Sequence, residues 1–202
     1  MSKYIKMGAG ILLVVVLAFF YAHIDKNTYL YDRKADTSTF LNTGILLEGE
    51  TISQTFLSKE ELLSGVNIKC GITGDVRNVT LKYSFIETNT GKELASGAKA
   101  ADEIENNKFN VLTVDTFQAE IGKAYTLKLE EVGSDEANGV SFYIVPEKKD
   151  FVENVLVKEA QTQGVLAVRS ISHQFDAETF FVLLGFVIFI IIFMRLLYRL
   201  FK

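Results

Sequence analysis

The sequence predicts an all-β fold, an antiparallel β-sandwich (jelly roll), flanked by two transmembrane α-helices. Three observations lead to this prediction. Apolar and polar residues alternate along many short segments in the middle of the chain, which is typical of antiparallel sheets with one face in water. An unbroken apolar run stands near each end, and each run with its flanks reaches the roughly 20 residues that cross a bilayer. All acidic residues lie between the two runs.

The N-terminal run predicts an anchor, and we expect residues 1–23 to form a cytoplasmic tip and the first transmembrane helix. A cleaved signal peptide is the alternative, because Lys3 and Lys6 resemble the basic start of such a peptide. Bulky Phe20, two residues before Ala22, disfavours cleavage at that point. The sequence therefore favours an uncleaved anchor.

The middle of the chain divides into a stalk and a domain. Residues 24–43 are polar and predict a juxtamembrane stalk, and the alternation in residues 44–174 predicts the extracytoplasmic β-sandwich. The turn residues Asn138-Gly139 indicate a hairpin. Short helices are expected only near residues 59–63 and 100–105. The strands are expected at residues 51–57, 66–72, 79–85, 111–117, 125–129, 140–145, 155–158 and 165–171.

The C-terminal run predicts the second transmembrane helix at residues 177–198, followed by a cytoplasmic tail at residues 199–202. Basic residues beside transmembrane helices stay in the cytoplasm. We therefore expect a plasma-membrane protein with both termini inside and residues 23–178 outside. The residues that predict this topology are Lys3, Lys6, Arg195, Arg199 and Lys202.

The charge of the outer segment excludes some partners. Residues 23–178 hold all 25 acidic residues and 16 of the 21 basic residues, which is a formal charge of −9. Nucleic acid and anionic lipid surfaces would repel such a domain. The lipid bilayer is expected as a partner only through the two helices.

The sequence predicts no enzyme and no cofactor. Cys70 is the only cysteine, and a sortase-like cysteine transpeptidase would need it beside a histidine and an arginine. Arg169 and His173 both follow Cys70 here, whereas sortases place the histidine before the cysteine. Cys70 also falls on the apolar side of its strand, where a thiol packs as a small hydrophobe with a raised pKa. A core cysteine is therefore favoured.

A metal site is not favoured either. One cysteine and two histidines cannot build a transition-metal site. Asp102, Glu103 and Glu105 are candidates for binding calcium, but they lack the spacing of a dedicated calcium loop, and a solvated acidic loop is the favoured interpretation.

Aromatic residues supply the candidates for ligand binding. The chain has no tryptophan, which disfavours a site of the kind that stacks sugars on exposed rings. Tyr83, Tyr125 and Tyr143 remain as candidates. The first two alternate in phase with core residues, so burial is favoured for them.

Several strand and turn segments carry a resemblance. They are residues 50–56, 62–68, 79–84, 90–94, 122–127 and 164–169. Together they resemble the galactose-binding-like jelly rolls attached to bacterial membrane proteins of surface-polysaccharide assembly. The resemblance covers residues 44–170 and implies no catalytic residue.

The resemblance implies an accessory or binding subunit of cell-envelope polysaccharide assembly or export. Its partners would be a multi-span glycosyltransferase or polysaccharide transporter, a second copy of the chain, or a glycan. A polysaccharide chain-length regulator is the alternative, because such proteins share two spans around an outer domain. They resemble long helical hairpins with a proline-rich segment at the second span, whereas this chain is β-patterned and has one proline, Pro146.

Overall fold

The computed structural model describes residues 3–201, without the side chains of residues 3, 4, 6–8, 24 and 174. The chain forms two compact units. One unit combines the two ends of the chain, up to Asp25 and from His173 onward. The other unit is the continuous segment Lys26–Ser172. Lys202 and the side chains of Lys3 and Lys6, which the topology prediction uses, lie outside this description.

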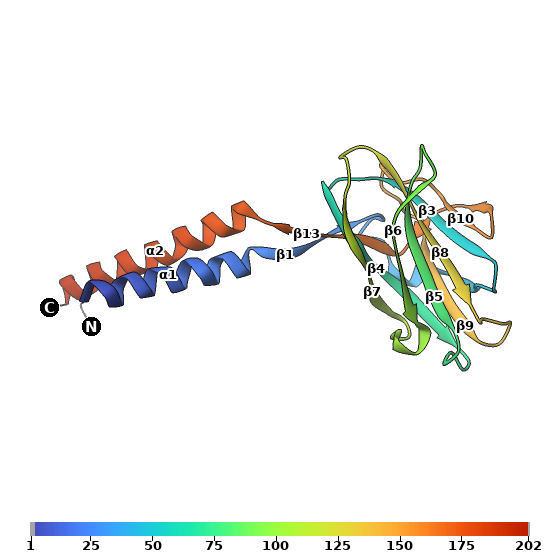
Figure 1. Cartoon of the computed structure of the whole chain (residues 1–202), viewed down its shortest axis with the longest axis horizontal. Helices are drawn as coiled ribbons and strands as arrows, with labels where there is room; N and C mark the ends of the chain where they lie inside the picture. Colours follow the sequence, from blue (N-terminus) through green and yellow to red (C-terminus); the bar gives the residue numbers. More distant parts are fainter. Residues whose placement is uncertain (1–2, 202) are drawn as a thin grey trace. The chain divides into compact units, whose positions relative to one another are not determined.

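The unit of the chain ends holds the two long helices, α1 (Lys3–Tyr21) and α2 (Ala177–Leu200) (Figure 1). Within the described residues, α2 is the one helix that is long and apolar enough to cross a membrane. The apolar part of α1, Ala9–Tyr21, is shorter than the length that a membrane span requires. The helix α2 is therefore a candidate for the predicted second span, whereas α1 does not meet the same length and composition for the predicted first span.

Capping and a backbone hydrogen bond fix the start of α2 next to the end of α1. The Asp176 side chain accepts from the Thr179 backbone N–H at 3.1 Å and so satisfies a free donor in the first turn of α2. The Asp176 N–H donates to the Ala22 carbonyl at 2.9 Å and ties the start of α2 to the end of α1. Ala18 and Ala22, at the end of α1 and just after it, are buried. Their small side chains let neighbouring segments approach closely.

The remaining elements are strands and two short 3₁₀ turns, η1 (Thr37–Thr39) and η2 (Ala101–Glu103). The strands are β1 (His23–Tyr29), β2 (Leu41–Ile45), β3 (Thr51–Leu57), β4 (Leu62–Thr73), β5 (Thr80–Glu87), β6 (Lys92–Ala100), β7 (Lys108–Gln118), β8 (Ala124–Val132), β9 (Gly139–Val145), β10 (Val155–Val157), β11 (Ala160–Thr162), β12 (Val165–Leu166) and β13 (Val168–Phe175).

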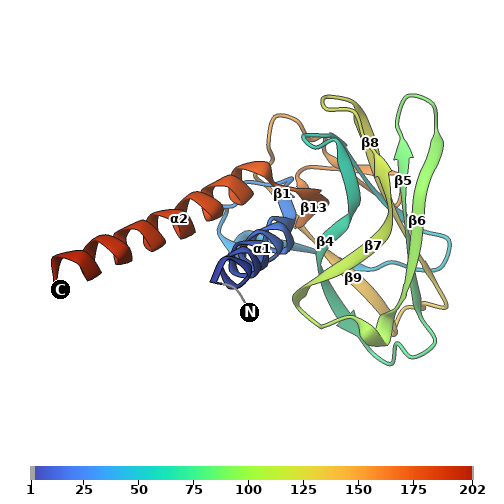
Figure 2. The same ribbon diagram turned by 60° about the vertical axis from the view of Figure 1, so that its left-hand side comes forward.

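These strands form two antiparallel sheets, seen as two layers in Figures 1 and 2. The six-stranded sheet has the order β11-β10-β3-β8-β5-β6. The seven-stranded sheet has the order β1-β13-β4-β9-β12, with β7 on the other edge of β4 and β2 paired to β9. The predicted all-β architecture of two antiparallel sheets is confirmed.

The core lies between the two sheets and follows the predicted alternation. Every second residue of β3, β5 and β8 is buried, and the same holds for most of β4 and for the middle of β7. Burying one such large apolar side chain contributes about 1.5–3 kcal/mol. Large apolar residues of this core include Ile52, Phe56, Leu63, Val66, Ile68, Leu81, Phe85, Leu112, Leu127, Leu129, Phe142 and Ile144.

The predicted stalk differs from the structure. Most of residues 24–43 belong to the compact unit that begins at Lys26, and they add β1 and most of β2 to the seven-stranded sheet. Leu30 and Tyr31 are buried in the core. The segment looks like a stalk in the sequence because β1 is an edge strand, which exposes polar side chains.

Three local predictions were also wrong or incomplete. Residues 59–63 form no helix and instead lead into β4. The edge strand β6 was not predicted, because its small and polar residues show no apolar alternation. Asn138-Gly139 joins β8 to β9, which lie in different sheets, so this turn does not close a hairpin.

Candidate functional site

The structure separates the three candidate tyrosines. Tyr83 and Tyr125 are buried, and each uses its hydroxyl internally. The Tyr83 hydroxyl donates to the Thr113 carbonyl at 2.9 Å, and the Tyr125 hydroxyl accepts from the Glu120 backbone N–H at 2.9 Å. Tyr143 is half-buried instead and faces outward from β9.

The acidic loop offers no metal centre. Asp102 and Glu103 are exposed in η2, and Glu105 forms a 2.5 Å salt bridge with Lys108. Across residues 3–201, no three His, Cys, Asp or Glu side chains converge as metal ligands would.

The residues of the cysteine hypothesis point in different directions. Cys70 is fully buried in the core, and burial together with the nearby Glu131 carboxylate raises the pKa of its thiol to about 12. Arg169 lies on the outward side of the same sheet, between inward-facing Val168 and Ser170. The thiol and the guanidinium are therefore on opposite sides of the sheet.

The two histidines meet in the unit of the chain ends. His173 Nδ1 lies 2.9 Å from the Asp25 carboxylate, and the His23 ring lies 6.2 Å from the His173 ring. His23 also packs against Phe19 and Phe175, with ring centroids 4.5 Å and 5.3 Å away. Both residues come from positions beside the helices, as the sequence indicates. On α2, Arg195 and Arg199 are exposed near the C-terminal end.

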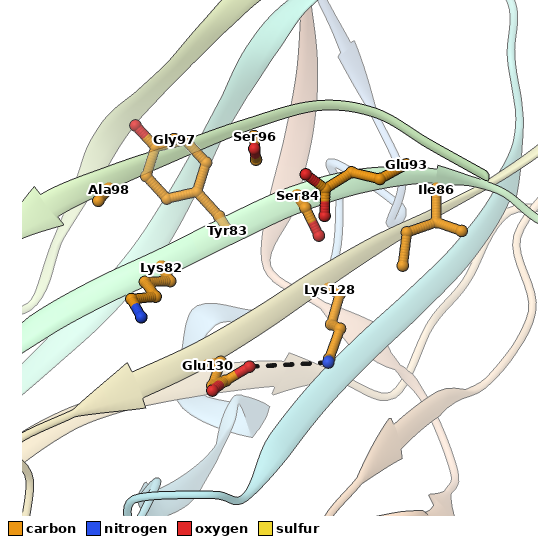
Figure 3. A pocket seen from close by; sticks show the side chains of 10 residues that line it. All are labelled: Lys82, Tyr83, Ser84, Ile86, Glu93, Ser96, Gly97, Ala98, Lys128 and Glu130. Atoms are coloured by element: carbon orange, nitrogen blue, oxygen red, sulfur yellow. Dashed lines mark ion pairs between the residues drawn. The ribbon is translucent and has the colours of Figure 1, made fainter. Parts of the chain in front are cut away.

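A shallow polar depression of about 530 Å³ lies on the outer face of the six-stranded sheet (Figure 3). Its lining holds two basic and two acidic side chains: Lys128 and Glu130 form an ion pair at 3.6 Å, and Lys82 and Glu93 stand apart from each other on β5 and β6. The only aromatic residue in its lining is Tyr83, whose ring packs under Gly97. The depression is balanced in charge and offers no exposed ring.

The opposite outer face, on the seven-stranded sheet, has a different character. Aromatic rings and basic side chains alternate across it, from β1 to β7 and β9. We define the cation–aromatic face as Tyr29, Phe40, Lys69, Phe109, Tyr143 and Arg169, all of them half-buried. The alternation of β4 places Lys69 and Asn67 on this side because Val66, Ile68 and Cys70 fill the core.

Each cation of this face is held against two rings. The Lys69 Nζ lies 4.7 Å from the Tyr143 ring centroid and 5.5 Å from that of Phe40. The Arg169 Cζ lies 4.8 Å from the Phe109 centroid and 5.4 Å from that of Tyr29. One such cation–π contact contributes about 0.5–1 kcal/mol at an exposed site. The rings thus fix the positions of both positive charges.

A third cation joins the edge of the face. The Arg33 Cζ lies 5.5 Å from the Tyr29 ring centroid, and Tyr29 in turn accepts a 2.9 Å hydrogen bond from Arg169 Nη1. Tyr31 lies beside Tyr29, with centroids 5.4 Å apart. Burial raises the pKa of Tyr31, and the charges of Arg169 and Arg33 oppose this rise. Two positively charged side chains, Arg169 and Arg33, therefore lie close to Tyr29 and Tyr31.

The face has positive charge without carboxylate partners. Within the described part of the chain, Lys69, Arg169 and Arg33 form no salt bridge. Six other basic residues of the Lys26–Ser172 unit do form one, namely Lys26, Arg77, Lys108, Lys123, Lys128 and Lys158.

Two buried polar atoms on this face also have no hydrogen-bond partner among the described residues, Arg169 Nε and Asn67 Oδ1. The two residues are register partners on β13 and β4. Leaving a buried donor or acceptor unsatisfied costs about 1–3 kcal/mol. The face therefore holds, beneath its surface, a donor and an acceptor that no described residue satisfies.

Only part of this site could be read from the sequence. Alternation predicts that Asn67 and Lys69 face away from the core. Tyr29 and Phe40 lie in the predicted stalk, and no local pattern shows that they reach β4 and β13.

The comparisons with known proteins add no relative: no protein-family model matches the chain, and no curated protein matches it.

Proposed function

We propose that this chain is a non-enzymatic two-pass membrane protein that presents a jelly-roll domain outside the cell. It acts as an accessory or binding subunit in cell-envelope polysaccharide assembly or export. The observation that carries this proposal is the cation–aromatic face, whose positive charges are held by rings on the outside of the sandwich. The last strand of the sandwich, β13, leads directly into the apolar helix α2.

The strand pairing supports the jelly-roll part of the proposal. β2 pairs with β9, β3 with β8, β4 with β7 and β5 with β6. The first strand of this series thus lies beside the last, and the pairing continues inward, as in a long hairpin rolled into two sheets. The segments that resemble galactose-binding-like domains fall within the same region.

The membrane part of the proposal rests on both helices. α2 is long enough to cross the bilayer, and Arg195 and Arg199 near its end favour a cytoplasmic C-terminus. The apolar part of α1 runs from Ala9 to Tyr21 and the helix itself begins at Lys3, so α1 becomes a full span if its first residues also enter the bilayer.

The alternatives are less well supported. A chain-length regulator would need long helices outside the membrane, and the described outer segment consists of strands. A sortase would need Cys70 at the surface beside an arginine, and this thiol is buried.

Extraction in mild detergent tests the proposed role. We expect the tagged full-length protein to co-purify with a multi-span enzyme or transporter of envelope glycans, identified by mass spectrometry, or as a homo-oligomer. A monodisperse monomer without such a partner would contradict the accessory role.

Protease added to intact cells tests the topology. We expect digestion of the segment 23–178 and protection of a tag at either terminus. Recovery of either tag on an externally released fragment would refute two spans with both termini inside.

A further inference from the structure

We propose that the cation–aromatic face binds a glycan that carries carboxylate groups, a uronate-containing polysaccharide or its lipid-linked precursor. This inference rests on the proposed function and adds the class of ligand. Its chemistry would be ion pairing of sugar carboxylates with Lys69 and Arg169, with hydrogen bonds from sugar hydroxyls to the polar groups between them.

The positive charge of the face favours a negatively charged ligand. Lys69, Arg169 and Arg33 contact aromatic rings and form no salt bridge with a carboxylate among the described residues. A quadrupolar ring face holds a cation without neutralising it. The guanidinium of Arg169 also offers a planar set of donors that matches a carboxylate. An anionic group is therefore the natural partner.

The hydrogen-bonding groups favour a sugar over a simple anion. Asn67 Oδ1 is an acceptor without a described partner, so only a donor can satisfy it, and because the atom is buried a sugar hydroxyl would reach it once the Asn67 side chain turns outward. A carboxylate or phosphate offers acceptors alone, whereas sugar hydroxyls both donate and accept. Asn42 and Ser141, which hydrogen-bond each other at 2.9 Å, add further polar groups beside Tyr143.

The net negative charge of the domain repels anionic ligands at a distance, so an anionic ligand must be held by direct contacts with the face. The outer segment carries a formal charge of −9 and repels extended anionic surfaces. Salt screens this repulsion beyond about 8 Å at physiological ionic strength, while contacts at the face act within that distance. A flexible glycan with separated carboxylates meets this condition better than a membrane surface.

The face is also arranged before the ligand arrives. Each of the two cations is held between two rings, so little side-chain freedom remains to be lost on binding. The depression on the opposite sheet (Figure 3) lacks this arrangement and supplies a matched control, Lys82.

Calorimetric titration of the full-length protein in detergent micelles tests the inference. The probes are a hyaluronan hexasaccharide, which alternates uronate and amino sugar, and the same hexasaccharide with its carboxyl groups reduced. We expect the uronate form to bind at least about tenfold more tightly, equivalent to one charge-assisted hydrogen bond. Added salt should weaken its binding.

Four variants locate the binding. Lys69→Gln and Arg169→Gln should each weaken uronate binding about tenfold or more. Arg169→Lys should have an intermediate effect because it keeps the charge and loses the planar donors. Lys82→Gln removes a charge from the other sheet and should leave binding unchanged. Unfolding curves of all four variants confirm that each is folded.

Each other result overturns the inference in its own way. Equal binding of the carboxyl-reduced hexasaccharide would exclude a role for charge. Equal binding of a tri-glutamate peptide, or of phosphatidylglycerol nanodiscs lost in the same variants, would replace the glycan by an acidic peptide or a lipid headgroup. Absence of all binding, in a protein that still co-purifies with glycan machinery, would refute this inference and leave the proposed function standing.

Discussion

Glu131 provides the most direct test of how the domain is held together. It is a fully buried carboxyl group at the end of β8. Its Oε2 accepts from the Val140 backbone N–H at 2.9 Å, and its Oε1 has no partner among the described residues. Burial raises the pKa of Glu131 from 4.5 to about 7, and the Val140 hydrogen bond opposes part of the rise.

The raised pKa makes stability depend on pH in a defined direction. Below about pH 4.5 the carboxyl is protonated in both the folded and the unfolded chain. Between that value and about pH 7 the folded state binds more protons, so the free energy of unfolding falls as pH rises. A pKa raised from 4.5 to about 7 corresponds to a loss of about 3 kcal/mol once the pH exceeds the folded value.

The substitution Glu131→Gln removes this titration and keeps the shape of the side chain. Denaturant unfolding of the full-length protein, followed by tyrosine near-ultraviolet circular dichroism, gives the free energy of unfolding at about pH 5 and about pH 8. We expect the wild type to lose about 2.5 kcal/mol more than Glu131→Gln over this range, because a small part of the loss already occurs below about pH 5. Glu130→Gln alters the neighbouring, half-exposed carboxyl and should follow the wild type.

The reasoning would be refuted by parallel pH profiles of wild type and Glu131→Gln. The same profile for Glu130→Gln and Glu131→Gln would also contradict it, because the effect would then not depend on burial.

Three further predictions concern stability. Cys70→Ser should retain function and lose about 1–3 kcal/mol of stability, because a hydroxyl replaces a buried thiol; a folded but inactive variant would restore the nucleophile hypothesis. Gly65→Ala should cost at least about 2 kcal/mol, since its φ is +152° and a Cβ would lie 2.3 Å from the Leu112 carbonyl. Gly91→Ala, with positive φ and no atom within 4 Å, should cost less in the same denaturant assay. Tyr83→Phe should lose about 1 kcal/mol with its cross-sheet hydrogen bond, and any loss of glycan binding would contradict its assignment to the core.

The strands that the sequence predicts well are those with one buried side. The predicted strand at residues 51–57 coincides with β3, because every second residue from Ile52 to Phe56 is buried in the core. β1 and β6 were missed because they are edge strands, whose polar and small residues resemble a loop. The order of strands in the sheets depends on long-range pairing, which alternation does not encode.

The same distinction explains what could be predicted of the binding face. That Lys69 points away from the core follows from the period of β4 alone. That it meets Tyr143 and Phe40 depends on β9 and the segment before β2, which lie 74 and 29 residues away in the chain. The hairpin predicted at Asn138-Gly139 was wrong for a related reason. The Asp135 side chain accepts from the N–H groups of residues 137 and 138, and the loop that these bonds close leads into the other sheet.

The single thiol in the core also allows unfolding of the domain to be measured by chemical labelling. Because Cys70 is the only cysteine and is fully buried, a maleimide can modify it only when the sandwich opens. The rate of labelling in whole cells would therefore measure how often the domain unfolds in its native membrane, with no added dye or engineered residue. Any molecule that binds only the folded domain would slow this labelling in proportion to its occupancy, so candidate ligands could be compared without purification.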